Sequence, residues 1–144
     1  MRRQSKKAST TLEAYYELTK PGITLMILIS TALGYYIGGD GIDKYPHFII
    51  TLIGSCLISA GSGALNHFAE SESDKFMQRT NMRPIPSGII APKHAMIFGL
   101  ALIILGCNLL YYFINPLTCI LALITSLLYL FIYTPLKKVT WLNT

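Results

Sequence analysis

Three oxygen-bearing side chains, Asn66, Glu70 and Asp74, follow one another at intervals of four residues. In an α-helix each residue turns by about 100°, so a step of four residues drifts by only about 40° and the three side chains share one face. Amide and carboxylate oxygens are the ligands that a hard cation such as Mg²⁺ accepts, together with substrate phosphate and water. The spacing therefore predicts a magnesium site on one side of a helix, with Asn66, Glu70 and Asp74 as ligands.

The same stretch has a simpler interpretation as a solvated helix end, whose acids pair with the basic residues that follow them (Glu70, Glu72 and Asp74 with Lys75 and Arg79). Two features favour the metal site. Asn66 lies inside an otherwise apolar run, and Arg79 and Arg83 follow the acids with a spacing of four. Guanidinium groups bind phosphate oxygens bidentately, so acids followed closely by arginines are the composition expected of a metal–diphosphate site.

The composition predicts that the helix carrying these residues belongs to a membrane protein. Hydrophobic residues make up 52% of the 144 residues and charged residues only 13%, whereas a soluble domain carries about 25% charged residues. Charged side chains are absent from three stretches of 19, 25 and 43 residues (21–39, 45–69 and 94–136). A spanning helix needs about 20 apolar residues, so the third stretch is long enough for two helices, with a turn at Asn115-Pro116. We therefore predict an all-α polytopic transmembrane bundle of four helices, at about 21–39, 46–68, 95–113 and 117–134.

The basic residues are distributed unevenly over the predicted connections. Eleven of the twelve Lys and Arg residues precede the first helix, lie between the second and third, or follow the fourth, and only Lys44 lies between the first and second. Because Lys and Arg concentrate in cytoplasmic loops, both termini and the 69–93 segment are expected in the cytoplasm. The net charge of +5 thus reflects topology, and we expect a lipid bilayer, not nucleic acid, as the partner.

The connecting segments divide the chain further. Residues 1–14 are polar and basic and are expected to form a cytoplasmic tail, which leaves residues 15–144 as the membrane domain. A short interfacial helix over 13–20 is expected to lead into Pro21, which suits the first turn of a helix. The 69–93 segment contains acids, bases and three prolines, and we expect it to hold a shape over the mouth of a cavity.

Residues 66–88, NHFAESESDKFMQRTNMRPIPSG, resemble the first aspartate-rich motif of the UbiA-type prenyltransferases. That family has Asn-x-x-x-Asp-x-x-x-Asp followed by Arg-Thr-x-x-Arg-Pro-x-x-Ser-Gly or close variants. Residues 17–21, ELTKP, are similar to the family's approach to its first helix, and residues 133–137, YTPLK, are similar to its Tyr-x-x-x-Lys motif. Glu70 stands where Asp is more common, and Gly22 stands where Arg often follows the Lys-Pro pair. Glu70 and Met77 make the chain look most like the branch that farnesylates protoheme IX.

The resemblance implies a fold of nine transmembrane helices around a central cavity, with a second acidic motif in its second half. This chain resembles the first half, and we expect it to be an N-terminal fragment or part of a split protein. The resemblance also implies that Asn66, Glu70 and Asp74 hold Mg²⁺ in a multi-pass protein of a bacterial inner membrane. Farnesyl diphosphate and haem b are the implied substrates, and the diphosphate would be bound by basic and aromatic side chains (Lys20, Arg79, Arg83, Tyr133 and Lys137).

Several of these assignments have alternatives that the sequence leaves open. Tyr133 is equally suited to the aromatic belt at a membrane interface, and Lys137 to a cytoplasmic anchor. The acceptor could be an aromatic acid or a quinone precursor in place of haem. A four-helix membrane scaffold without catalytic activity is a third hypothesis, which predicts that Asn66 and Asp74 are dispensable for prenyl transfer.

Overall fold

A computed structural model of the protein describes residues 10–39 and 45–139, with side chains up to Leu136. Within these residues the secondary structure is entirely helical, as the sequence predicts. The elements in chain order are α1 (Thr11–Leu18), α2 (Pro21–Gly38), α3 (Tyr45–Phe76), α4 (Pro92–Phe113), α5 (Pro116–Leu128), the π-helix η1 (Tyr129–Tyr133) and α6 (Thr134–Val139).

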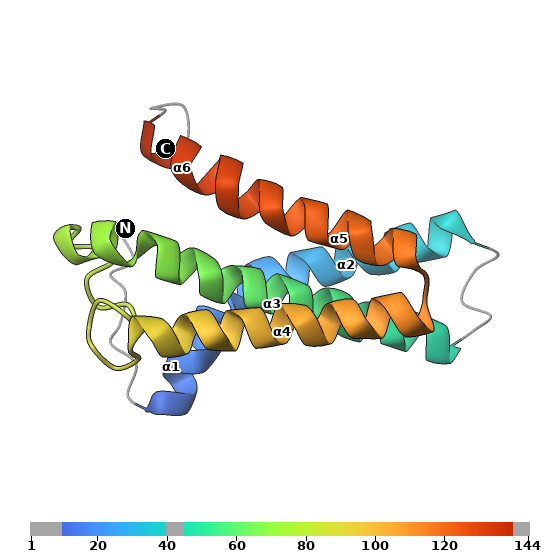
Figure 1. The fold of residues 1–144 in the computed structure, drawn as a ribbon, viewed down its shortest axis with the longest axis horizontal. Helices are drawn as coiled ribbons and strands as arrows, with labels where there is room; N and C mark the ends of the chain where they lie inside the picture. The colour runs from blue at the N-terminus through green and yellow to red at the C-terminus, as the bar shows by residue number, and fades with distance from the viewer. Residues whose placement is uncertain (1–9, 40–44, 140–144) are drawn as a thin grey trace.

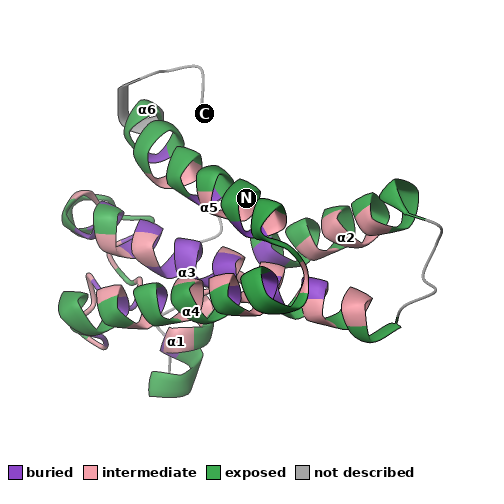
Figure 2. Cartoon of the chain, turned by 45° about the vertical axis from the view of Figure 1, so that its right-hand side comes forward, coloured by how far each residue is buried: buried purple, intermediate pink, exposed green. Residues whose placement is uncertain are grey.

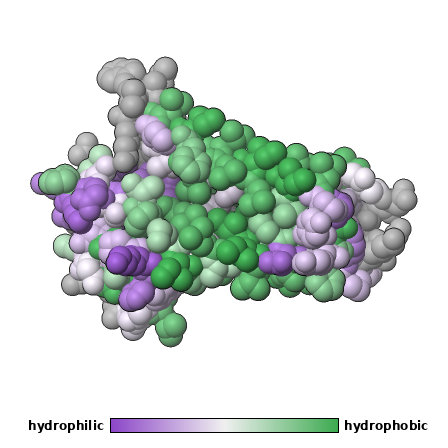
Figure 3. All heavy atoms as spheres, in the orientation of Figure 1, coloured by the Kyte–Doolittle hydropathy of each residue, from purple (hydrophilic) through white to green (hydrophobic). Residues whose placement is uncertain are grey.

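Four of the described segments are long and apolar enough to cross a membrane: α2, α3, α4 and the continuous stretch Pro116–Leu136. This confirms the four spans predicted from the charge-free runs. The spans alternate in direction, so that the start of α2, the end of α3, the start of α4 and α6 lie at one end of the bundle (Figure 1). Hydrophobic side chains form a band across the middle of the molecule, and hydrophilic side chains gather mainly at that same end (Figure 3). We call it the polar end.

Helix α3 is the central element and contributes more buried residues than any other described element (Figure 2). Its 32 residues span about 48 Å at 1.5 Å per residue, which exceeds the roughly 30 Å of a hydrocarbon core. The helix therefore continues out of the apolar band, as expected from the sequence, and its last turns carry Asn66, Glu70 and Asp74. The buried face of α3 thus runs without interruption from the membrane core to the polar end.

Helices α3 and α4 approach each other at two pairs of glycines, Gly54 with Gly106 and Gly61 with Gly99. A Cβ atom added at Gly61 would lie 2.5 Å from the Gly99 carbonyl oxygen, and one at Gly106 would lie 2.7 Å from the Gly54 carbonyl oxygen. Small residues let helix backbones pack closely where lipid provides no hydrophobic drive for association. These two contacts hold α4 against α3 and leave the opposite side of α3 for α2 and α5.

The short helix α1 packs beneath the polar end. Its N-terminus is capped by Thr10, whose hydroxyl accepts a hydrogen bond from the Glu13 N–H at 3.2 Å. Ala14 and Leu18 are fully buried against Ala64 of α3. The helix corresponds to the interfacial helix expected over 13–20, but it begins earlier, so the last residues of the expected tail are helical. Residues 1–9 lie outside the described part of the chain.

The fourth span departs from the single regular helix expected over 117–134. Asn115 caps α5 by accepting a hydrogen bond from the Thr118 N–H at 2.7 Å, which agrees with the predicted turn at Asn115-Pro116. The helix then widens into η1, where the Thr134 N–H donates to the Tyr129 carbonyl five residues earlier. Pro135 lacks an N–H, and its ring would clash with the carbonyl of residue 131 in a regular helix. The π-turn takes up this misfit before α6 begins.

Candidate functional site

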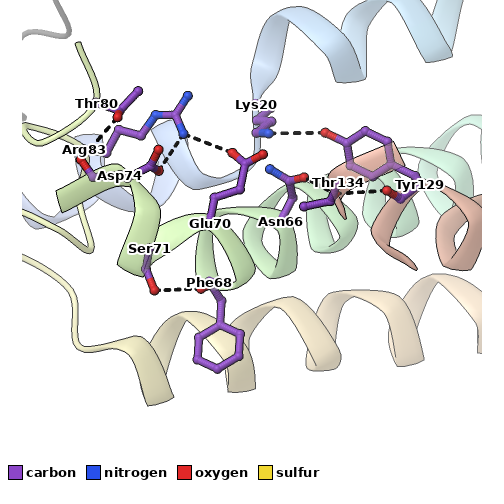
Figure 4. Close-up of polar contacts among 10 residues, drawn as sticks. All are labelled: Lys20, Asn66, Phe68, Glu70, Ser71, Asp74, Thr80, Arg83, Tyr129 and Thr134. Atoms are coloured by element: carbon purple, nitrogen blue, oxygen red, sulfur yellow. Dashed lines mark hydrogen bonds and ion pairs between the residues drawn. The ribbon is translucent and has the colours of Figure 1, made fainter. Parts of the chain in front are cut away.

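The predicted acidic face is present on α3, and it is buried. Asn66, Glu70 and Asp74 are 1%, 5% and 4% exposed, so the alternative of a solvated helix end is wrong for Glu70 and Asp74. It holds for Glu72, which is exposed and pairs with Lys75 at 2.8 Å. Figure 4 shows Asn66, Glu70 and Asp74 projecting from one side of α3 toward the end of the fourth span and the loop that follows α3.

Arg83 from that loop lies between the two buried carboxylates. Its Nη1 atom donates to Asp74 Oδ2 at 2.6 Å and to Glu70 Oε2 at 3.2 Å (Figure 4). The loop is held in place by the buried Thr80, whose hydroxyl donates to the Asp74 carbonyl oxygen at 3.2 Å. The turn around Thr80 thus brings Arg83 back over the end of the helix from which the loop departs.

The carboxylate oxygens of Glu70 and Asp74 converge on one nitrogen atom of Arg83, so the protein already places a positive charge at this point. Among the described residues no cluster of three or more His, Cys, Asp or Glu side chains could hold a metal ion. A cation site here would therefore use two carboxylates and an amide, Asn66 being the side chain one turn away on the same face. Mg²⁺ bound through one or two carboxylates and a substrate phosphate needs no larger protein set, so these residues fit it.

Asn66 is held by the start of α6. Thr134 Oγ1 lies 2.7 Å from Asn66 Oδ1 and 3.0 Å from the Tyr129 carbonyl oxygen. Asn66 Nδ2 is buried and has no hydrogen-bond partner among the described residues. A buried amide nitrogen without a partner is uncommon in proteins and marks a place where a ligand or a rearrangement is needed.

Lys20 approaches the site from the start of α2. Its Nζ atom donates to the Tyr129 hydroxyl at 3.2 Å (Figure 4). Lys20 has a positive φ of 48°, and it is the only non-glycine residue in the described part of the chain to do so. This left-handed conformation costs about 1–2 kcal/mol for a residue with a Cβ, and a residue before proline normally adopts an extended backbone. In this backbone conformation the ammonium group of Lys20 points toward Tyr129 and the interior of the bundle.

A cavity of about 300 Å³ begins at Lys20 and Tyr129 and runs between α2, α3 and α5. On α2 it extends from Lys20 to Thr31, which is about 16 Å at 1.5 Å per residue. Ile23, Ile27 and Ile58 contribute apolar wall, and hydroxyl groups such as those of Thr24 and Ser59 are bonded to each other at 3.0 Å. The cavity is elongated along the helices, apolar along much of its length, and positively charged at its mouth.

Glu17 of α1 is a further acid near the polar end. Burial raises the pKa of its carboxyl above the ordinary value of 4.5, and the positive charge of Arg83 partly opposes the shift. Arg83 therefore acts on Glu17 as well as on Glu70 and Asp74.

The structure describes the side chains of Arg79 and Tyr133, two further residues predicted for this site. Arg79 is exposed on the loop. Tyr133 is 46% exposed and stacks on Tyr129 with ring centroids 5.4 Å apart. The side chain of Lys137 lies outside the described part of the chain.

Tyr129 and Thr134 are site residues that the sequence analysis did not identify. Tyr129 lies one turn before Tyr133, and Thr134 follows Tyr133 directly, so both were adjacent to the residues singled out. The π-turn between them changes which side chains face α3, and helical periodicity gives no sign of it.

Comparison with known proteins was made against families, curated proteins and solved structures. The family described as "UbiA prenyltransferase family" matches residues 27–144. A protoheme IX farnesyltransferase of Leptospira biflexa is 42% identical over 118 residues, covering 82% of this chain and 42% of that protein. Proteins of the same name from Solibacter usitatus and a Synechocystis species are 41% and 40% identical, covering 90% and 92% of this chain and 48% and 42% of their own lengths.

The chain thus spans about half the length of the curated relatives it matches. No solved structure matches it.

Proposed function

The chain belongs to the UbiA prenyltransferase family, and on this premise we propose that it binds farnesyl diphosphate and takes part in transferring the farnesyl group to a vinyl group of protoheme IX. One observation carries the proposal. Two buried carboxylates converge on the positive charge of Arg83 at the polar end of the bundle, and Lys20 at the same end lines an elongated cavity between the spans. A ligand with an anionic head and an apolar tail matches this arrangement at both ends.

The residues at the polar end would bind and orient the diphosphate. Asn66, Glu70 and Asp74 would hold Mg²⁺, which when bound neutralises diphosphate charge and makes it a better leaving group. Lys20 at the cavity mouth would place a positive charge where negative charge develops as the C–O bond breaks. Arg83 would exchange its carboxylate partners for phosphate oxygens, since guanidinium binds both. The exposed Arg79, together with Lys137 and Tyr133, is proposed to reach the diphosphate from the aqueous side.

The cavity would take the farnesyl chain. Its volume of about 300 Å³ is at the lower end of the range for small-molecule pockets. In the reaction the bond between the allylic carbon and the diphosphate oxygen breaks, and the diphosphate leaves with the electron pair. The vinyl group attacks the allylic carbon, and water adds to the resulting cation with loss of a proton. Apolar walls would keep water from the allylic carbon until the acceptor has reacted.

The identity of the acceptor rests on the relatives. Those cited above are named protoheme IX farnesyltransferases and match most of this chain at about 40% identity. The cavity between α2, α3 and α5 accounts for the donor, and haem would approach from the membrane or from surfaces outside the described residues. We further propose that the polar end faces the cytoplasm of a bacterial cell, where diphosphate substrates are available.

Membranes containing the chain, incubated with Mg²⁺, labelled farnesyl diphosphate and either haem b or 4-hydroxybenzoate, test this function. We expect label on haem, and we expect Asp74→Asn to abolish it. Glu72→Gln is the matched control, because Glu72 is an exposed acid on the same helix that pairs with Lys75. Label on the benzoate alone would assign the chain to aromatic prenylation. Equal labelling of haem by the native chain and by Asp74→Asn would contradict the role of Asp74, and no label on either acceptor would agree with a scaffold without catalytic activity.

A further inference from the structure

We propose that Thr134 is a positioning residue that allows Asn66 to turn its amide oxygen toward a cation. The inference rests on the proposed function, because it takes Asn66, Glu70 and Asp74 as cation ligands. It concerns a residue of α6 that is 4% exposed, belongs to a different span from the three ligands, and bonds to Asn66 through its hydroxyl group.

The hydrogen bonds around Thr134 are overcommitted. Its hydroxyl carries one hydrogen but lies within bonding distance of two acceptors, Asn66 Oδ1 at 2.7 Å and the Tyr129 carbonyl oxygen at 3.0 Å. The Asn66 amide has the opposite problem, since its buried Nδ2 has no hydrogen-bond partner in the described part of the chain. Figure 4 shows this nitrogen on the side of Glu70 and the oxygen on the side of Thr134.

Rotating the amide by half a turn gives Asn66 Nδ2 a partner and leaves the Thr134 hydroxyl with a single acceptor, so that only Asn66 Oδ1 is left without a partner. Nδ2 then donates to Thr134 Oγ1, and the Thr134 hydroxyl gives its single hydrogen to the Tyr129 carbonyl. The two ends of an amide have nearly the same shape, so the rotation needs no repacking. Asn66 Oδ1 then lies where Nδ2 lay, on the side of Glu70, with its lone pairs available.

The rotated state needs a cation. An amide oxygen facing a carboxylate oxygen is unfavourable unless a positive charge lies between them, whereas an amide nitrogen facing it is acceptable. Without a cation the amide therefore keeps the orientation in Figure 4, and a bound cation favours the rotated one. A hydroxyl is suited to both states, because it donates to Oδ1 in the first and accepts from Nδ2 in the second.

The π-turn is what makes this possible. In η1 the Tyr129 carbonyl is five residues before Thr134 and accepts from both its N–H and its hydroxyl. When the Thr134 hydroxyl gives its hydrogen to the Tyr129 carbonyl oxygen, its own oxygen can accept a hydrogen bond from Asn66 Nδ2. Thr134→Val would preserve the shape of the side chain but remove the hydroxyl group, whereas Thr134→Ser would keep the hydroxyl group.

Mn²⁺ titration of the purified chain in detergent micelles, with the free ion measured by electron paramagnetic resonance, tests the inference without using activity. We expect Thr134→Val to weaken Mn²⁺ binding by about tenfold or more, the usual effect of removing a partner of a metal ligand. Thr134→Ser is expected to bind nearly as well as the native chain. Thr51→Val is the matched control, because Thr51 is a buried threonine of α3 whose hydroxyl donates to the His47 carbonyl oxygen of its own helix.

Two further results separate this inference from the function on which it rests. Asp74→Asn is expected to abolish Mn²⁺ binding. If it does so while Thr134→Val binds like the native chain, the role of Thr134 is wrong and the cation site stands. If the native chain does not bind Mn²⁺, or Asp74→Asn binds it unchanged, both proposals are wrong. Thr134→Ala removes the same hydroxyl group by a second substitution and should weaken Mn²⁺ binding as Thr134→Val does. The melting temperatures of all variants report any loss of folding.

Discussion

Arg83 supplies the charge that makes the acidic face of α3 tolerable in the absence of a metal. Two carboxylates buried side by side repel each other, and each is costly to desolvate without a partner. A single guanidinium nitrogen within 3.2 Å of both offsets these costs. A cation bound at the proposed site would take the place of Arg83, and its binding would then be linked to a movement of the loop after α3.

Replacing Arg83 by Met tests this role through stability. Removing one partner of a buried ion pair typically costs about 3–5 kcal/mol, and we expect a loss near the lower end, because the Arg83 side chain is 18% exposed. Added Mg²⁺ should raise the melting temperature of Arg83→Met more than that of the native chain, since the cation takes the vacated position. The exposed Arg79→Met is the control. Equal destabilisation of both variants, or an equal response to Mg²⁺, would contradict the assignment.

Glu17 gives a prediction about pH. Its pKa is raised from 4.5 by burial, with Arg83 opposing the shift, so the folded state holds the proton more tightly than the unfolded state does. Stability contributed by this group therefore falls as the pH rises above 4.5. Glu17→Gln removes the effect. We expect the variant to be more stable than the native chain at pH 7 and equally stable below pH 4.5.

Melting temperatures of both chains across this pH range provide the measurement. Titration of the other carboxylates is common to the two chains and cancels in the difference between them. A difference that stays constant with pH would show that Glu17 is not the titrating group.

The candidate site residues that could be predicted from the sequence are those that lie close together in the chain, on one helix. Asn66, Glu70 and Asp74 are related by helical spacing within one element, so their common face followed from sequence alone. Tyr129 and Thr134 were missed because their contacts depend on a π-turn and on a contact 68 residues apart in the chain, between Thr134 and Asn66. The burial of the acids was likewise not evident, because it arises from a loop that folds back and a span that packs alongside.

At the scale of elements, length and charge determined the spans, and glycines determine how closely two of them pack. The predicted spans match α2, α3, α4 and Pro116–Leu136 to within a few residues at most ends. The sequence analysis considered no contact between particular helices. The pairing of Gly54 with Gly106 and of Gly61 with Gly99 requires knowing that α3 and α4 are antiparallel neighbours in a given register.

Gly61→Ala should separate α3 from α4. The added methyl group would lie 2.5 Å from the Gly99 carbonyl oxygen and 2.7 Å from Ile103 Cγ1, and overpacking of this kind typically costs about 1–3 kcal/mol. Gly34→Ala is the matched control, because an added Cβ there has nothing within 4 Å and alanine favours the helix. Unfolding in mixed detergent micelles, followed by circular dichroism, measures both. An unchanged midpoint for Gly61→Ala would contradict the close contact.

At the scale of the whole molecule, the cavity forms only when several helices of the chain pack together. Its walls come from α2, α3 and α5, and its charged mouth forms where the start of α2 meets the fourth span at the end of α3 that carries the acids. Because the spans alternate in direction, the hydrophilic side chains gather mainly at the polar end (Figure 3), where α3 carries the buried acids. The site and the topology signal therefore lie on the same side of the membrane.

The orientation of the bundle can be tested with single cysteines in a background lacking Cys56, Cys107 and Cys119. Gln78 is exposed on the loop at the polar end, and Gly39 is exposed at the opposite end with an extended φ of −134° that any residue adopts. Since eleven of the twelve Lys and Arg residues fall in the sequence segments that a four-span topology assigns to the side of Gln78, the positive-inside rule predicts a cytoplasmic position for that side. A membrane-impermeant maleimide should label Gly39→Cys in intact cells and Gln78→Cys only after permeabilisation. The reverse pattern would place the acids of α3 outside, away from cytoplasmic diphosphate substrates, and would contradict the proposed function along with the orientation.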